Sequence, residues 1–315
     1  MAKIIAKANV HNHTKNWWLL LLAALVLYGL VPQFKSFKSS LMTIKHADFA
    51  LVGASIVCLI LSYITGALVY QVISKRRLKY SRTLLVQAAG GFTNRLIPGG
   101  GGALATNADY LIKAGYSLSS ASALVSLNNL LGFVGNVTLL AITLMTTHTK
   151  LSAVHGLHLT DLKILLVLLI IVATLILTFV KSLRVRLERF LKQTLGDMIQ
   201  NMKSIPRVLG GFVASAATTI LLVSSFYYTC LAVNLHLSIA QIFWVFVIGV
   251  IFSTLSPTPG GLGGAEAGIV LSLTSIGVSS QQALAAALSY RLVSYWLPIL
   301  PGLICFQLSR RRHLL

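Results

Sequence analysis

Acidic residues and cysteines are scarce in this sequence of 315 residues. It contains six Asp and Glu residues against 26 Lys and Arg residues, and only three cysteines. Cys58, Cys230 and Cys305 lie far apart inside apolar runs, without the close spacing that metal ligands show. This pattern predicts small buried hydrophobic side chains and excludes a cysteine-based metal site.

The residue patterns of common catalytic sites are also missing. The glycine run at 99–102 has no following Lys-Ser/Thr pair, which excludes a nucleotide-binding phosphate loop. No nucleophile motif or histidine–carboxylate dyad stands inside the apolar runs, and the three histidines of 148–158 have no carboxylate or cysteine at close ligand spacing. We therefore expect no enzymatic activity, no metal and no cofactor.

Apolar residues dominate instead, at 56% of the chain against 10% for charged residues. Several apolar runs approach the roughly 20 residues that a helix needs to cross about 30 Å of hydrocarbon. These features predict an all-α, polytopic membrane protein, with residues 1–315 forming one integral membrane domain. Six full spans are expected, near residues 17–31, 48–73, 118–147, 161–180, 207–234 and 282–306.

Two Pro/Gly-rich segments interrupt the apolar pattern. The later one, 257–268, contains two prolines, five glycines and Glu266, and the earlier one begins at Pro98. Such residues cannot continue a regular helix, and irregular backbone at membrane depth is tolerated only inside protein or beside a wet cavity. The arms at 83–97 and 103–115 are too short to span, so we expect two re-entrant hairpins. The alternative is an ordinary loop with Glu266 at the surface.

The two segments belong to a weak internal repeat. Residues 115–117 correspond to 277–279, and residues 128–129 fall opposite 290–291 at the same offset. Paired interruptions in two halves of a membrane protein indicate a transport site at the repeat interface. The first repeat is expected over about 48–147 and the second over about 206–306.

The distribution of basic residues predicts the orientation. If residues 1–16 are cytoplasmic and each hairpin returns to its own side, 19 Lys and Arg residues face the cytoplasm and five face outward. Cytoplasmic loops carry the excess of Lys and Arg in membrane proteins. We therefore expect a multi-pass cell-membrane protein with both termini cytoplasmic. Three spans separate the hairpins, so the hairpins insert from opposite sides, which is inverted topology.

The net charge of +20 also invites a nucleic-acid interpretation, which the clustering of the charges excludes. The basic residues form short clusters between spans and are not interleaved with aromatic residues on a soluble module. Residues 181–205 hold one such cluster, with leucines at three- and four-residue steps. This pattern predicts a basic amphipathic helix on the anionic cytoplasmic leaflet. The sequence leaves open whether the protein forms a homodimer.

The Pro/Gly motifs resemble those of a known family, the transmembrane region of lysylphosphatidylglycerol synthases and the related stand-alone flippase-like membrane proteins. Residues 259–263 through Glu266 are similar to the family's Pro-Gly-Gly-Gly-Glu signature, and Arg291 looks like its recurring arginine. Residues 94–95 and 98–100 resemble its Asn and Pro-Gly element. The resemblance implies a membrane-embedded, flippase-like fold without the soluble aminoacyl-transfer domain.

The chain departs from the family pattern near the first glycines. Ala103 and Thr106 stand where relatives often carry an acidic and a basic residue, and Asn128-Asn129 stand where a charged pair is expected. The resemblance therefore leaves the headgroup preference open.

A phospholipid flippase or scramblase is the expected function, because glycine amides and arginines can meet a phosphate as the headgroup crosses between the hairpins. Glu266 would meet an ammonium group or Arg291, and we expect these two lone charges to contact each other. A secondary carrier of a small solute or ion, and a non-transporting scaffold, are the alternatives. The predicted substrate-binding residues are Asn94, Arg95, Pro98, Gly99, Gly100, Asp109, Pro259, Gly260, Gly261, Gly263, Glu266 and Arg291.

Overall fold

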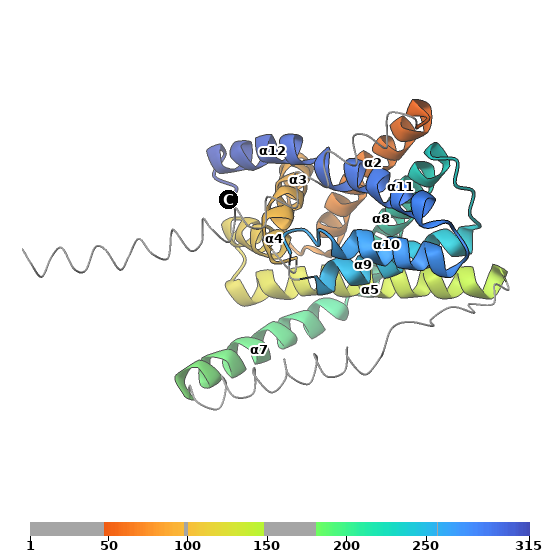
Figure 1. Cartoon of the computed structure of the whole chain (residues 1–315). Helices are drawn as coiled ribbons and strands as arrows, with labels where there is room; N and C mark the ends of the chain where they lie inside the picture. Colours follow the sequence, from red (N-terminus) through yellow and green to blue (C-terminus); the bar gives the residue numbers. More distant parts are fainter. Residues whose placement is uncertain (1–46, 98–99, 148–180, 257) are drawn as a thin grey trace, which may run out of the picture.

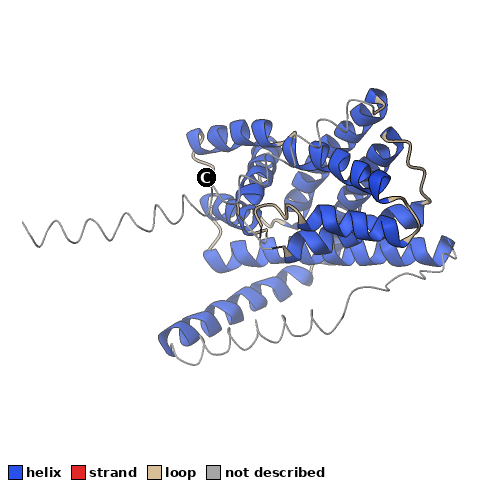
Figure 2. Cartoon of the chain, in the orientation of Figure 1, coloured by secondary structure: helices blue, strands red, loops and turns tan. Residues whose placement is uncertain are grey.

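The computed structural model describes residues 47–97, 100–147, 181–256 and 258–315 (Figure 1). Helices build the fold throughout these ranges (Figure 2), which confirms the expected all-α class. The elements are α2 (Phe49–Ile73), α3 (Tyr80–Leu96), α4 (Gly101–Lys113), α5 (Leu118–Thr147), α7 (Lys181–Met202), α8 (Ile205–Ala232), α9 (Ile239–Leu255), α10 (Gly264–Ser275), α11 (Ser280–Arg291), the π-helical turn η1 (Leu292–Trp296) and α12 (Ile299–Arg311).

Four helical stretches are long and apolar enough to cross a membrane, and each matches a predicted span. They are Phe49–Ile73, Leu118–Thr143, Ile205–Ala232 and Ser280–Arg311. The predicted spans at 17–31 and 161–180, and the histidine-containing loop at 148–158, lie outside the described residues.

Polar side chains at the helix starts explain why the helices begin where they do. The Asp48 carboxylate accepts hydrogen bonds from the backbone N–H groups of Ala50 at 2.8 Å and Leu51 at 3.4 Å, at the start of α2. Ser238 and Gln241 form a reciprocal capping box at the start of α9. Such caps satisfy N–H groups that have no partner inside the helix.

Helices α2 and α8 pack against each other through small polar residues. The Ser55 hydroxyl donates to the Ser225 carbonyl at 2.8 Å, and the Thr218 hydroxyl donates to that of Thr65, also at 2.8 Å. Small residues let membrane helices approach closely, and hydroxyl groups bond across the contact. This pair forms one wall of the cavity described below.

The arms of the two predicted hairpins are consecutive helices that pack on each other: α3 on α4, and α9 on α10. The turns that follow α4 and α10 share their backbone geometry. Gly115 and Gly277 have φ values of +92° and +90°, a region that glycine enters without a Cβ penalty. The next N–H group donates back to Leu111 O in one turn and to Leu273 O in the other, both at 3.1 Å. The two turns thus have the same local geometry, while the internal repeat stays a prediction.

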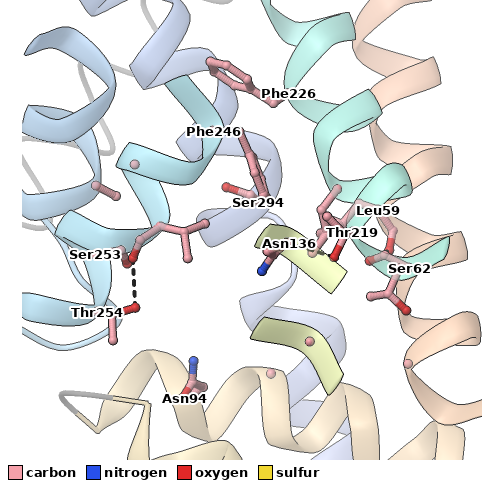
Figure 3. A pocket seen from close by; sticks show the side chains of 18 of the residues that line it. Leu59, Ser62, Asn94, Asn136, Thr219, Phe226, Phe246, Ser253, Thr254 and Ser294 are labelled. Carbon is pink, nitrogen blue, oxygen red and sulfur yellow. Dashed lines mark hydrogen bonds between the residues drawn. The ribbon is translucent and has the colours of Figure 1, made fainter. Parts of the chain in front are cut away.

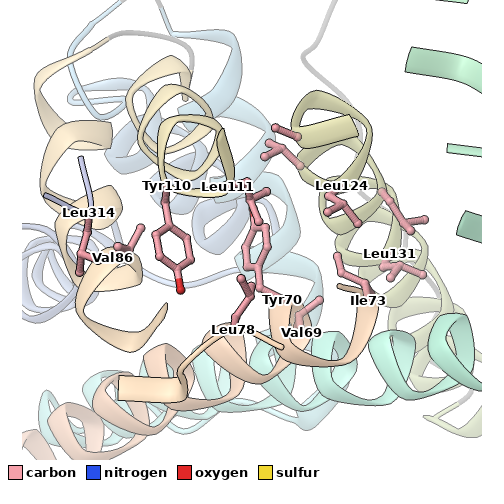
Figure 4. Close-up of a cluster of buried hydrophobic side chains, with 13 residues drawn as sticks. Val69, Tyr70, Ile73, Leu78, Val86, Tyr110, Leu111, Leu124, Leu131 and Leu314 are labelled. Atoms are coloured by element: carbon pink, nitrogen blue, oxygen red, sulfur yellow. The ribbon is translucent and has the colours of Figure 1, made fainter. Parts of the chain in front are cut away.

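The hydrophobic core has two clusters. The first draws on α2, α3, α4 and α5 and includes Val69, Tyr70, Tyr110, Leu111 and Leu124 (Figure 4). The second draws on α8, α9, α10 and α11, around the fully buried Phe226. Leu314 and partly buried residues of α7 and α8 also pack in the first cluster, so both halves of the chain contribute to it.

The last span departs from expectation, because it is not one uninterrupted α-helix. Residues Leu292–Trp296 form a π-helical turn between α11 and α12. A π turn moves backbone carbonyls out of the ordinary helical pattern and often marks a functional position. The carbonyls of Ser294 and Tyr295 accept hydrogen bonds from Arg95, which lies about 200 residues earlier.

The basic segment is helical as predicted, and forms α7. Leu191, Leu195 and Ile199 lie exposed at four-residue steps on this helix, next to the exposed Lys192. The helix contacts α5, where the Ser120 hydroxyl donates to the Asp197 carboxylate at 2.6 Å. An apolar stripe therefore remains uncovered by the described part of the chain.

Candidate functional site

A cavity of about 800 Å³ lies between the two halves of the chain (Figure 3). Its walls come from α2, α3, α5, α8, α9, α10, α11 and η1, so both halves of the chain contribute. Polar side chains line it from every side. They include Ser62, Tyr63, Gln87, Asn94, Arg95, Asn128, Asn129, Asn136, Thr218, Thr219, Ser253, Thr254, Tyr290, Arg291 and Ser294.

The buried charges at one end of the cavity form an ion pair. Arg291 Nε lies 3.2 Å from Glu266 Oε1, and the two residues are only 7% and 9% exposed. The other carboxylate oxygen of Glu266 accepts the backbone N–H of Gly263 at 2.9 Å, at the start of α10. The expected contact between these two charges is confirmed. The pair holds the glycine-rich loop against α11, because both charges are costly to bury alone.

Arg291 also binds the glycine-rich loop before α10 directly. Its Nη2 donates to the Gly260 carbonyl at 3.1 Å, and its guanidinium lies 4.4 Å from the centre of the Tyr295 ring. Cation–π contact of this kind is favourable, most of all away from water. Arg291 makes these contacts and also lines the cavity.

Arg95 joins the first half of the chain to the second. Its Nε donates to the Tyr295 carbonyl at 2.9 Å, its Nη2 donates to the Ser294 carbonyl at 2.6 Å, and its Nη1 donates to the Gly91 carbonyl. Nη2 also donates to the Tyr63 hydroxyl at 3.3 Å. Most of the five N–H groups of a guanidinium are therefore used within the protein. Two of these hydrogen bonds go to carbonyls of the π turn.

The tips of the two hairpin pairs meet at this point. A Cβ built on Gly260 would lie 3.2 Å from the Arg95 Cα and would collide with the ring of Tyr295, whose hydroxyl donates to the Arg95 carbonyl at 3.3 Å. A Cβ on Gly261 would collide with Ser253 of α9, including its backbone. Both glycines also have positive φ, at +59° and +67°. Only glycine combines that backbone conformation with so close an approach.

Amide side chains make up much of the polar wall. Asn94 Oδ1 is buried and makes no hydrogen bond with any described residue. The side chain of Asn129, on α5, also makes no hydrogen bond within the described ranges, whereas that of Asn136 accepts one from Thr219 at 2.9 Å. In Figure 3, Asn94 and Asn136 lie on different sides of the open space. Amides offer both donors and acceptors, so this wall can bind anionic and cationic groups.

Apolar side chains line part of the same cavity. Phe133 of α5 and Val250 of α9 both line it, and they are 66% and 41% exposed. Leu222, Phe226 and Phe246 add apolar surface deeper inside. A polar wall that ends at exposed apolar side chains suits an amphiphilic occupant better than a fully polar one.

Several predicted site residues come together here. Asn94, Arg95, Gly260 and Arg291 line the cavity, and Glu266 stands directly behind Arg291. The remaining predicted residues of the second motif, Pro259, Gly261 and Gly263, form the loop that Arg291 and Glu266 hold.

Two other predicted residues stand apart from the cavity lining, and two more are not described. Gly100 is the N-cap of α4, with φ +79°. Asp109 lies 3.5 Å from Lys113 in a half-exposed pair one helical turn apart. Pro98 and Gly99 lie outside the described residues.

Tyr295 is the central residue that sequence reasoning missed. It contacts Arg95 and Arg291, and its ring lies where a Cβ on Gly260 would be. Its position four residues after Arg291, on the same helical face, is the one signal that points to it. The predicted repeat also pointed to Asn128 and Asn129, because it pairs them with Tyr290 and Arg291. All four residues line the cavity.

Curated relatives match only part of this chain. A phosphatidylglycerol lysyltransferase of Staphylococcus epidermidis is 34% identical over 89 residues, which are 28% of this chain and 10% of that protein. The protein of the same name from Staphylococcus haemolyticus is 29% identical over 97 residues, 31% of this chain and 11% of that protein. An uncharacterized protein of Synechocystis sp. is 37% identical over 79 residues, about a quarter of each chain. Each match thus covers only about a tenth of the length of the lysyltransferase.

A family-wide match extends much further. The sequence pattern of the family described as the lysylphosphatidylglycerol synthase TM region matches residues 16–302. That range includes both Pro/Gly motifs, the Glu266–Arg291 pair and every described wall of the cavity. This multi-pass membrane protein therefore belongs to the family of the lysylphosphatidylglycerol synthase transmembrane region.

Proposed function

We propose that this protein moves phospholipid headgroups between the two leaflets, through the cavity that lies between its two halves. One observation carries the proposal: the tips of both hairpin pairs meet at one end of a large cavity whose wall is partly polar and partly apolar. A headgroup needs polar partners across the hydrocarbon, while its acyl chains need an apolar exit. The exposed Phe133 and Val250 would provide that exit between α5 and α9.

The headgroup phosphate would meet Arg291. Its hydrogen bonds with described residues use Nε and Nη2, so donors remain on a guanidinium that lines the cavity. Arg95 is less suited to this role, because its donors are directed at backbone carbonyls. The free Asn94 Oδ1 would accept a hydrogen bond from an ammonium or hydroxyl group of the headgroup. Arginine is the preferred partner for phosphate.

We further propose that the helix pairs α3–α4 and α9–α10 are re-entrant and enter from opposite sides of the membrane. Their lengths support this, since α4 and α10 have 13 and 12 residues and are too short to span. The matching turns after α4 and α10 support an internal repeat. In inverted repeats of this kind, substrate sites lie near the membrane midplane.

The orientation follows from the basic residues. We propose that both termini and α7 lie on the cytoplasmic side, with the exposed stripe of Leu191, Leu195 and Ile199 against the anionic leaflet. Apolar residues would enter the headgroup region while Lys192 stays at the surface. The staphylococcal relatives are named phosphatidylglycerol lysyltransferase, after an anionic phospholipid. This name supports a lipid substrate for the present protein.

Leaflet exchange in liposomes tests the proposal. Purified protein is reconstituted with fluorescent phosphatidylglycerol or phosphatidylcholine, and a membrane-impermeant reductant quenches the label in the outer leaflet. The wild-type protein should expose inner-leaflet label that protein-free liposomes protect. Asn129→Leu should slow exchange about fivefold, because one headgroup hydrogen bond of about 1 kcal/mol is lost.

Two features allow the effect of Asn129→Leu to be assigned to the cavity. The Asn129 side chain makes no hydrogen bond with a described residue, so the substitution leaves no partner unpaired. Ser126→Leu, one turn earlier on α5 at an exposed position that does not line the cavity, is the matched control. Wild-type liposomes that exchange no lipid but accumulate a solute would favour the small-solute carrier. Equal rates for the two leucine variants would place the path elsewhere.

A further inference from the structure

A second cavity, of about 280 Å³, lies where three segments distant in sequence meet. They are the loop between α2 and α3, the end of α4, and the residues that follow α12. None of its lining residues lines the large cavity. Its basic lining residues are Arg77, Lys79, Arg82, Lys113, Arg312 and His313.

Apolar anchors fix these segments beside one another. Leu78 and Leu314 are buried in the same cluster as Val86 and Tyr110 (Figure 4). The chain reverses at His313, which has φ +53°, and the Leu314 N–H donates to the Ser309 carbonyl at 2.9 Å. The buried leucines therefore hold Arg77, Lys79, Arg312 and His313 at the cavity rim.

A further hydrogen bond fixes the loop from the other side. The Arg76 N–H donates to the Tyr116 hydroxyl at 2.8 Å, and the Arg76 guanidinium lies 5.5 Å from the centre of the same ring. The loop between α2 and α3 is therefore tied to the turn after α4. The cavity is a defined feature of the fold, not a chance gathering of flexible side chains.

The positive charge of this cavity is unbalanced. Lys113 pairs with Asp109 at 3.5 Å. Across the described ranges, Arg77, Lys79, Arg82 and Arg312 form no ion pair. The start of α3 adds to the positive potential, because Lys79 is its N-cap and no side chain caps it. Like charges held this close repel, and a bound anion would relieve the repulsion.

We propose that this cavity binds a phosphate group, carried either by an anionic lipid or by a free phosphate ion. Arginines and lysines converge on it from three segments, which matches the way basic pockets at membrane surfaces hold lipid phosphates. At about 30 Å³ per water molecule, the cavity has room for one phosphate with its bridging waters. The bound phosphate ties the loop before α3, the end of α4 and the chain after α12 together, at the base of the first hairpin pair.

Thermal unfolding of the full chain in neutral detergent tests the proposal. Inorganic phosphate is titrated against sodium chloride at equal ionic strength, and separate micelles contain phosphatidylglycerol or phosphatidylcholine. The phosphate-bearing ligand should raise the unfolding midpoint of the wild-type protein by about 3 °C. The double variant Arg82→Gln/Arg312→Gln should lose this shift. Both positions are exposed and their side chains form no hydrogen bond with a described residue, so folding should be preserved.

The matched control is Arg310→Gln/Arg311→Gln, which removes the same charge from neighbouring exposed positions that do not line the cavity. It should keep the wild-type shift. A shift with inorganic phosphate identifies the free ion as a ligand, and a shift with phosphatidylglycerol alone identifies the lipid phosphate. Equal shifts in both double variants, the same shift with sodium chloride, or no shift with either ligand would overturn the proposal.

Discussion

Replacing Arg291 with alanine should destabilise the protein by about 3 kcal/mol, the cost of leaving a buried charge without its partner. Glu266 would keep one hydrogen bond, from the Gly263 N–H, and lose its cation. The Gly260 carbonyl and the Tyr295 ring would each lose a partner as well. The midpoint of thermal unfolding in detergent should fall by about 6–12 °C.

Two companion variants identify the cause of this loss. Arg291→Lys keeps the charge but cannot bond Glu266 and the Gly260 carbonyl from one planar group, so it should be intermediate. Glu266→Gln combined with Arg291→Gln removes both charges and should recover a large part of the stability. If the double variant is no more stable than Arg291→Ala, the loss comes from packing and not from the unpaired carboxylate.

Replacing Gly261 with alanine should be comparably damaging, at about 2–5 kcal/mol. A non-glycine residue at φ +67° costs about 1–2 kcal/mol. The added Cβ also meets Ser253, including backbone atoms that cannot rotate away, and such overpacking adds about 1–3 kcal/mol. Unfolding in detergent, monitored by intrinsic fluorescence, measures the sum of the backbone cost and the overpacking cost.

Gly263 separates the two contributions. Its φ is +79°, but a Cβ built there meets no atom within 4 Å. Gly263→Ala should therefore show the backbone cost alone, about 1–2 kcal/mol. If Gly261→Ala is no worse than Gly263→Ala, the loop yields to the added methyl group, and the close approach to α9 is not needed for folding.

Much of this fold was predictable from local sequence. The span from Leu118 has the bounds read from the apolar pattern, and Asp48 caps α2 as a short acidic side chain should. The contact of Glu266 with Arg291 was also predictable, because two lone charges in apolar surroundings have few other partners.

The role of Arg95 could not be read from the sequence. An isolated arginine beside a Pro/Gly motif predicts phosphate binding, yet its donors reach carbonyls of a π turn about 200 residues away. The π turn has no local sequence signal, because it arises where α11 and α12 must pack against both halves of the chain. Tyr295 was missed for the same reason: its importance lies in long-range contacts to Arg95 and Gly260.

Blocking the cavity in a folded protein tests the central claim most directly. Cysteine is placed at position 129 in a background in which Cys58, Cys230 and Cys305 are replaced, and a bulky thiosulfonate modifies it in the reconstituted protein. The native cysteines do not line the cavity, and Asn129 does. The same modification of a cysteine at position 126 is the control. If headgroups pass through the cavity, modification at 129 abolishes leaflet exchange and reduction of the mixed disulfide restores it. Unchanged exchange at complete modification of position 129 would contradict the account.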